Sequence, residues 1–123
     1  MSPTQRALAY CKKQGWTAYI TERWNSFAKI RQDLLGFADL VVLDGRGGGP
    51  LAVQVTTTAH MRERERKIDA EPRAHLWLKS PARIEVWGFS KQGGRGKRKL
   101  WEITRRQVRL PMTDGTTLTV LDL

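Results

Sequence analysis

The chain of 123 residues contains one cysteine, Cys11, and two histidines. A lone cysteine cannot form an internal disulfide and supplies too few thiolates for a zinc finger. The sequence also lacks a run of about 18 apolar residues, which a membrane-spanning helix needs. Its first residues lack the apolar segment of a secretory signal. We therefore expect a cytoplasmic protein in a reducing, intracellular compartment, with no membrane partner and with Cys11 as a buried structural thiol.

Acidic residues are scarce, because 12 Asp and Glu stand against 22 Lys and Arg, for a formal net charge of +10. Such an excess on a small domain is typical of a protein that binds a polyanion, since each neutralised phosphate releases counterions. Attraction to an anionic membrane surface is the alternative. The chain lacks a basic helix with a large apolar face and a lipidation signal, so the charge favours nucleic acid.

The length allows one hydrophobic core, and no internal repeat or long linker divides the chain, so residues 1–123 are expected to form one domain. Hydrophobic periodicity and turn residues predict helices over 3–14, 59–69 and about 71–78. They predict strands over 16–24, 37–43, 51–57, 83–89 and 100–104. Residues 27–35 are expected to be a loop or an extended connection. The C-terminal part from Val108 is expected to be a hairpin whose turn is Thr113-Asp114-Gly115.

Two of these predicted strands each contain one polar residue inside an apolar run. Asp39 lies in the first strand, 37–43, and Gln54 lies in the second, 51–57. The short glycine-rich connection between them favours an antiparallel pair, which brings both residues to one edge. A carboxylate and an amide oxygen that meet there would suit a hard divalent cation. The alternatives are that Asp39 accepts backbone N–H groups or pairs with an arginine, and that Gln54 hydrogen-bonds across the sheet.

This pattern resembles the signature of the PD-(D/E)XK nuclease superfamily, in which an Asp, a hairpin and Glu/Gln-x-Lys follow one another. The resemblance extends from Ala18 to Phe89. It implies a restriction-endonuclease-like fold of the α/β (α+β) class, with an αβββαβ core and a central mixed sheet flanked by helices. A C-terminal β extension would follow this core. The small size is closest to phage-type or Holliday-junction-resolvase-like members.

The resemblance also implies a metal site for Mg²⁺ or Mn²⁺. The ion would be held by Asp39, Gln54 and the backbone carbonyl of Val55. Glu22 would add the acidic residue that many members carry upstream, although it can also be a solvated glutamate at a strand end.

The catalytic lysine of the family is missing, because Thr56 stands at its position. Thr56 can position a water molecule, or it can simply pack at a strand end. A relocated positive charge would restore the usual chemistry. Lys29 is the first candidate for it and Lys67 is the second, and either can instead contact a phosphate. Asp33 can orient Arg31 or join the site, or it can cap a loop.

Other residues are expected to contact DNA. Arg31 and Lys67 are predicted phosphate contacts, and Trp24, between polar neighbours, is the best candidate for stacking on a nucleotide. The glycine-rich segment 91–99, which contains Arg95, Lys97 and Arg98, is either a solvated turn or a mobile clamp on the phosphate backbone.

The sequence therefore predicts a metal-dependent endonuclease that hydrolyses DNA phosphodiester bonds. A domain of this size has little surface for reading bases, so cleavage is expected to be structure-selective or weakly sequence-specific. A homodimer would let two sites act on two strands. The alternatives are a catalytically decayed nucleic-acid-binding domain on the same fold, and a basic assembly protein in which Asp39 is structural.

Overall fold

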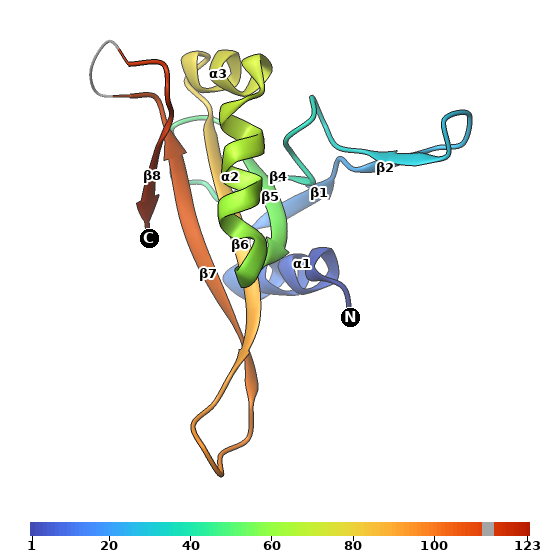
Figure 1. Ribbon diagram of the computed structural model, residues 1–123, viewed down its shortest axis with the longest axis vertical. Coiled ribbons are helices and arrows are strands. Elements are labelled where there is room, and N and C mark those ends of the chain that lie inside the picture. Colours follow the sequence, from blue (N-terminus) through green and yellow to red (C-terminus); the bar gives the residue numbers. More distant parts are fainter. Residues whose placement is uncertain (112–114) are drawn as a thin grey trace.

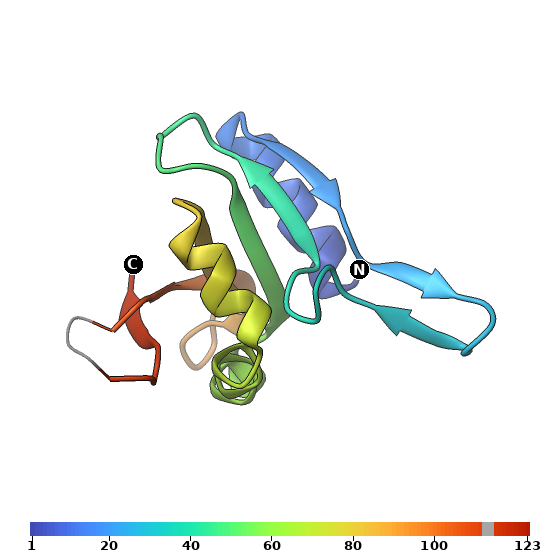
Figure 2. The same cartoon turned by 90° about the horizontal axis from the view of Figure 1, so that it is seen from above.

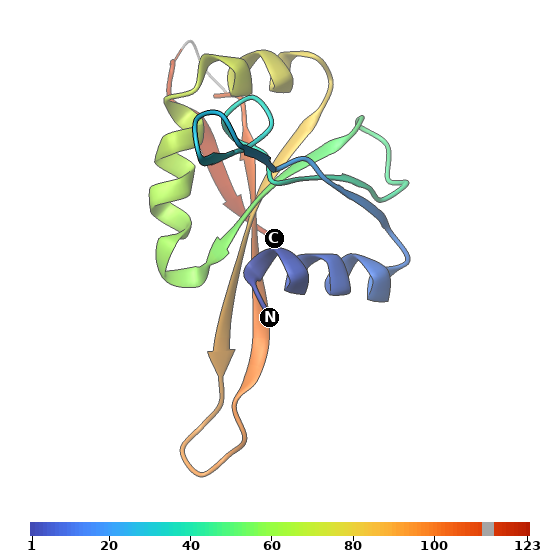
Figure 3. The same ribbon diagram turned by 90° about the vertical axis from the view of Figure 1, so that its right-hand side faces the viewer.

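A six-stranded mixed sheet separates one helix from two others in the computed structural model (Figures 1 and 3). The structure describes residues 1–111 and 115–123. The helices are α1 (Pro3–Gln14), the 3-10 turn η1 (Thr58–His60), α2 (Met61–Asp69) and α3 (Pro72–Lys79). The strands are β1 (Thr17–Ile20), β2 (Arg23–Asn25), β3 (Ile30–Gln32), β4 (Leu40–Leu43), β5 (Leu51–Thr57), β6 (Arg83–Gln92), β7 (Leu100–Arg109) and β8 (Thr119–Asp122).

The strand order in the main sheet is β1-β4-β5-β6-β7-β8, and β2 and β3 form a separate hairpin. All neighbours in the main sheet are antiparallel except β5 and β6, which are parallel. A parallel pair needs a long crossover, and α2 and α3 provide it. The mixed α and β class predicted from the sequence is confirmed.

A separate hydrophobic core lies against each face of the sheet. On the α1 face, Ala7 and Cys11 pack against Leu40, Val53 and Trp87. On the opposite face, α2 and α3 cover a second cluster, whose larger members are Phe37, Met61, Ile68, Ile84 and Val86. These two cores fix the position of β4 and β5, the strands that carry the polar residues of interest.

The burial predicted for Cys11 is confirmed, since 1% of this residue is exposed. Burial is the main cause that raises the pKa of its thiol to about 11.

Helix α1 matches the prediction because its ends are encoded locally. Ser2 caps it by accepting the Gln5 N–H at 3.2 Å, Pro3 occupies the first turn, and Gly15 ends it with a φ of 79°. Strand β5 also has the predicted bounds. No helix in the described part of the chain is long and apolar enough to span a membrane.

Several predicted boundaries are wrong. The strand expected over 16–24 ends at Ile20, and a second strand, β2, begins at Arg23. The expected loop or extended connection over 27–35 contains β3, which pairs with β2. Strand β4 begins at Leu40, so Asp39 immediately precedes it, and β7 runs five residues beyond its predicted end at 104.

In the C-terminal segment, β8 pairs antiparallel with β7, in agreement with the expected hairpin. The predicted turn falls partly on Thr113 and Asp114, which lie outside the described residues.

Two hairpins project from the sheet in different directions (Figures 1 and 2). One is β2–β3, inserted between β1 and β4. The other is β6–β7, which continues past the end of β5, because Thr57 pairs with Phe89 while β6 extends to Gln92. The connecting residues 93–99 are all exposed.

Candidate metal-binding site

Asp39 and Gln54 lie opposite each other at one end of the β4–β5 pair. The antiparallel register joins Leu40 to Val53 and so brings the preceding residue, Asp39, beside Gln54. Asp39 Oδ2 accepts hydrogen bonds from Gln54 Nε2 at 2.7 Å and from the Val55 N–H at 2.8 Å. Both side chains are buried. The predicted meeting of these two residues at one edge is confirmed.

Two further carboxylates join Asp39. Glu22 follows β1, and its backbone N–H donates to the Asp39 carbonyl at 3.3 Å. Asp33 follows β3, and a short loop then leads the chain back to the sheet at β4. In this loop the Leu34 N–H donates to the Ala38 carbonyl at 2.8 Å. One carboxylate oxygen from each of these three acids lies within 4.8 Å of the others. We call Glu22, Asp33 and Asp39 the acidic triad.

The acidic triad borders two concave surfaces. The first has a volume of about 400 Å³ and lies at the end of β5, where it is also lined by Gln54, Thr56 and His60. The second has a volume of about 920 Å³ and is lined by residues of the β2–β3 hairpin and by Lys67. Because Glu22, Asp33 and Arg64 line both, the two pockets adjoin at the triad.

Asp39 differs from its partners in its electrostatic surroundings. Glu22 pairs with Arg31 at 3.0 Å and Asp33 pairs with Lys67 at 3.4 Å, whereas Asp39 has no ion-pair partner among the described residues. Burial first, and then the hydrogen bond and negative charge of Asp33, raise the pKa of Asp39 from 3.8 to about 8, against the lowering effect of the Val55 N–H. The structure therefore stabilises the protonated form of Asp39 unless a cation is nearby.

This raised pKa gives a testable pH dependence. We expect the metal-free protein to lose unfolding free energy as the pH rises from about 4 to about 8, because the folded state holds the Asp39 proton more tightly than the unfolded state. The Asp39→Asn variant cannot titrate there. Urea unfolding in EDTA gives the unfolding free energy of both proteins, and the value for wild type minus that for the variant should fall steadily over this pH range. If this difference did not change with pH, the raised pKa would not belong to Asp39.

Gln54 contributes an unusual polar atom. Its Oε1 is buried and has no hydrogen-bond partner among the residues that the structure describes. A half-turn of the amide would exchange Nε2 and Oε1 and present an oxygen to Asp39 Oδ2. Two oxygens repel at such a spacing, and a shared divalent cation removes that repulsion. The donor set at this edge thus fits a hard cation.

The structure brings some predicted residues to this site and leaves others outside. Thr56 lines the smaller pocket and is buried. Lys67 reaches the triad through Asp33, and Arg31 reaches it through Glu22. Lys29 occupies the turn of the β2–β3 hairpin with a φ of 55° and is not among the residues lining either pocket. The structure therefore does not bring Lys29 to the acidic triad.

The remaining predicted nucleic-acid contacts are on the two projecting hairpins. Trp24 is 60% exposed on β2. Arg95, Lys97 and Arg98 lie in the exposed connection between β6 and β7.

The site predicted from the sequence includes neither Arg64 nor His60, although both line the smaller pocket. The available signal was their spacing, because residues 60, 64 and 67 share one side of a helix at i, i+4 and i+7. For Asp33 the sequence leaves open a role beside Arg31, in the site or as a loop cap, and the structure places it in the triad.

No protein-family model, curated protein or solved structure matches this chain. Its function is therefore inferred from the geometry and chemistry of the site.

Proposed function

We propose that this chain is a divalent-metal-dependent endonuclease, similar to the PD-(D/E)XK nucleases, that hydrolyses DNA phosphodiester bonds. The observation that carries this proposal is the acidic triad beside the buried Gln54 Oε1, which has no hydrogen-bond partner within residues 1–111 and 115–123. Hard oxygen ligands of this kind suit Mg²⁺ or Mn²⁺. If the inserted β2–β3 hairpin, η1 and α3 are set apart, the order α1, β1, β4, β5, α2, β6, with β5 and β6 parallel, supports the restriction-endonuclease-like core that the resemblance implies.

Asp39, the Gln54 amide oxygen and the Val55 carbonyl would hold the ion, and Glu22 or Asp33 would complete the set directly or through water. The N–H and C=O of a strand residue point toward the same neighbouring strand. Since the Val55 N–H donates to Asp39, its carbonyl faces the same edge. A bound Mg²⁺ supplies an acidified water and neutralises charge on the attacked phosphate.

Arg64 and Lys67 provide the positive charge that Thr56 cannot. The Arg64 Nε is buried without a hydrogen-bond partner in the described part of the chain, and the side chain lines both pockets. Lys67 lies 3.4 Å from Asp33. Fixed cations at such a position stabilise the charge that develops on a phosphoryl group in the transition state. In this scheme α2 supplies the cation that the family usually places on the strand.

DNA is the proposed partner because both projecting hairpins, β2–β3 and β6–β7, carry basic side chains. The exposed residues 93–99 project from the same end of the sheet as Thr57, and the net charge of the chain is +10. Contacts of this type hold the backbone without reading bases, which favours weak sequence specificity.

A cleavage assay tests the proposal. Purified protein is incubated with supercoiled, linear and branched DNA in Mg²⁺, Mn²⁺ or EDTA, and we expect strand cleavage with either ion and none in EDTA. Tight DNA binding without cleavage in any divalent ion would instead identify a decayed, non-catalytic domain. The Gln54→Glu/Thr56→Lys double variant separates the two cases further. The double variant should cleave DNA little faster than wild type if α2 already supplies the cation. It should cleave DNA where wild type does not if the native site has decayed.

Salt dependence tests the role of the β6–β7 connection. Replacing Arg95, Lys97 and Arg98 with glutamine should reduce the slope of log affinity against log salt by up to about 2.7, at about 0.9 per phosphate contact on duplex DNA. Fluorescence anisotropy at several NaCl concentrations measures this slope.

The matched control removes three exposed lysines at the C-terminal ends of α1 and α3, away from the acidic triad: Lys12, Lys13 and Lys79. A control slope that falls as much as that of the test variant would show that only net charge matters.

A further inference from the structure

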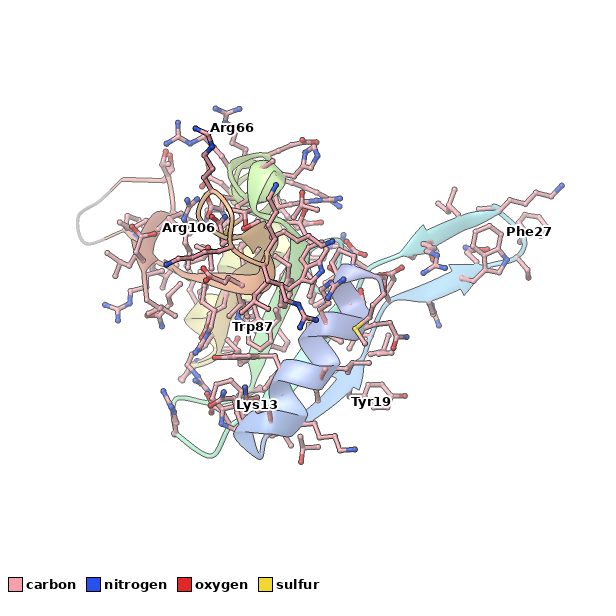
Figure 4. All side chains as sticks on the ribbon, turned by 90° about the horizontal axis from the view of Figure 1, so that it is seen from below. Lys13, Tyr19, Phe27, Arg66, Trp87 and Arg106 are labelled. Atoms are coloured by element: carbon pink, nitrogen blue, oxygen red, sulfur yellow. The ribbon has the colours of Figure 1, made fainter. Side chains whose placement is uncertain are left out.

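The β2–β3 hairpin exposes apolar side chains that contribute little to the fold. Phe27 in its turn is 99% exposed, Trp24 is 60% exposed and Ile30 is 50% exposed. Figure 4 shows Phe27 at the outer end of the hairpin. An isolated two-stranded hairpin is marginally stable. Exposed aromatic side chains on such a hairpin therefore indicate that it binds a partner.

The turn of this hairpin is held in a defined conformation. Asn25 Oδ1 accepts hydrogen bonds from the backbone N–H groups of Phe27 at 3.1 Å and Ala28 at 3.0 Å. The Asn25 side-chain amide also donates to Gln32 across the hairpin at 3.3 Å. These contacts fix the backbone beneath Phe27 and lower the conformational entropy that the turn loses on binding.

The charge of the hairpin indicates the kind of partner. Residues 23–32 contain three basic side chains, Arg23, Lys29 and Arg31, and no acidic one. An apolar tip flanked by cations is the arrangement that proteins use to insert between base steps while holding the adjacent phosphates. Two copies of this chain would bring like charges together at the tip, which disfavours self-association there.

The hairpin is also joined directly to the acidic triad, because Glu22 precedes β2 and Asp33 follows β3. Phe27 lies five positions after Glu22, and five steps of about 3.3 Å place their Cα atoms at most about 17 Å apart. This length corresponds to about five base-pair steps of about 3.4 Å. A tip bound to DNA would therefore lie within about five base pairs of a phosphate at the triad.

We propose that the β2–β3 hairpin is a wedge that inserts Phe27 where base stacking in the DNA is already interrupted, as at a branch point, and so selects the substrate. Inserting at such a point avoids most of the unstacking cost that an intact duplex imposes. Trp24 and the basic side chains hold the neighbouring nucleotides. This inference rests on the proposed DNA substrate but does not require cleavage.

The test compares binding to a four-way junction and to an uninterrupted duplex of the same sequence, in EDTA. A 2-aminopurine at the branch reports unstacking by increased fluorescence. We expect Phe27→Ala to reduce the preference for the junction about 5- to 150-fold, the range that one stacking contact provides, and to abolish the fluorescence increase. Duplex affinity should stay within about twofold. Phe27→Leu should retain most of the preference, since leucine also serves as a wedge.

Leu76→Ala is the matched control, because Leu76 is a large apolar residue 61% exposed on α3 and lines neither pocket at the acidic triad. A junction preference unchanged in Phe27→Ala, or lost equally in Leu76→Ala, would overturn the inference. Phe27-dependent binding to phosphatidylserine vesicles, or a Phe27-dependent dimer in sedimentation, without the fluorescence change, would also overturn it. Failure of the nuclease proposal would be distinct, because binding and unstacking would persist while no divalent ion supported cleavage.

Discussion

We expect the Asp39→Asn variant to lose at least about 10³-fold in the rate of divalent-dependent DNA cleavage. Asp39 is the central ligand of the proposed ion, and the ion supplies several kcal/mol of transition-state stabilisation, with each 1.36 kcal/mol worth about tenfold in rate. DNA affinity in EDTA should stay equal below about pH 8, where Asp39 is protonated, and should increase above it, where the variant removes a negative charge near phosphate. Single-turnover cleavage and anisotropy titrations measure the two effects separately.

Asp122→Asn makes the same chemical change on β8, where the Asp122 side chain is 86% exposed, and should leave cleavage unchanged. Circular dichroism and urea unfolding verify that the Asp39→Asn variant is folded. A folded Asp39→Asn protein that cleaves at the wild-type rate would remove Asp39 from the site. Equal losses of cleavage and of DNA binding would point to a binding defect instead.

The largest stability effect is expected at a buried ion pair on the α1 face of the sheet. Arg105 donates from Nε to Glu85 Oε1 at 2.8 Å and from Nη2 to Oε2 at 3.1 Å. Trp87 Nε1 donates to the same carboxylate at 2.8 Å, and the guanidinium lies 5.2 Å from the Trp16 ring centroid. Arg105→Met should cost about 3–5 kcal/mol of unfolding free energy, because it leaves a buried carboxylate without its counterion.

A double-mutant cycle provides the control. Adding Glu85→Gln to Arg105→Met removes the stranded charge and should recover much of the lost stability. Equilibrium urea unfolding of the four proteins gives the interaction energy. If Arg105→Met cost less than about 1 kcal/mol, the pair would behave as an exposed ion pair does, in conflict with the 3% exposure of Glu85.

The parts of the fold that were predictable from sequence are those whose signals are local. Helix α1 has a cap, a proline and a terminating glycine within its own segment. Strand β5 begins as an apolar run after turn residues, and Gln54 is the polar side chain enclosed between apolar neighbours in that run. The pairing of Asp39 with Gln54 followed because the connection between their strands is short.

The β2–β3 hairpin could not be predicted in the same way. Its strands have three residues each, which is too short for alternation to appear, and its aromatic side chains are exposed. The same insertion left the role of Asp33 open, because the chain leaves the sheet after Glu22 and returns only at the end of the hairpin. The triad therefore combines residues from three strand ends, and their spacing in the sequence does not indicate that they meet.

Strand β7 was predicted too short for a different reason. Its second half contains Arg105, Arg106 and Arg109, which read as a solvated segment. In the structure, Glu85 pairs with Arg105 and Glu65 pairs with Arg106. Those acids lie 20 and 41 positions earlier in the sequence, so only the three-dimensional pairing reveals the strand.

The buried thiol of Cys11 can be used to detect local unfolding of the native protein, because thiol reagents reach it only when α1 leaves the sheet. Only the thiolate is nucleophilic, and Cys11 is both 1% exposed and shifted to a pKa of about 11. A thiol reagent should therefore react only in molecules in which α1 has separated from the sheet. A second cysteine engineered on the surface, for example at Phe27, could be labelled selectively with a fluorophore while the natural thiol stays unmodified.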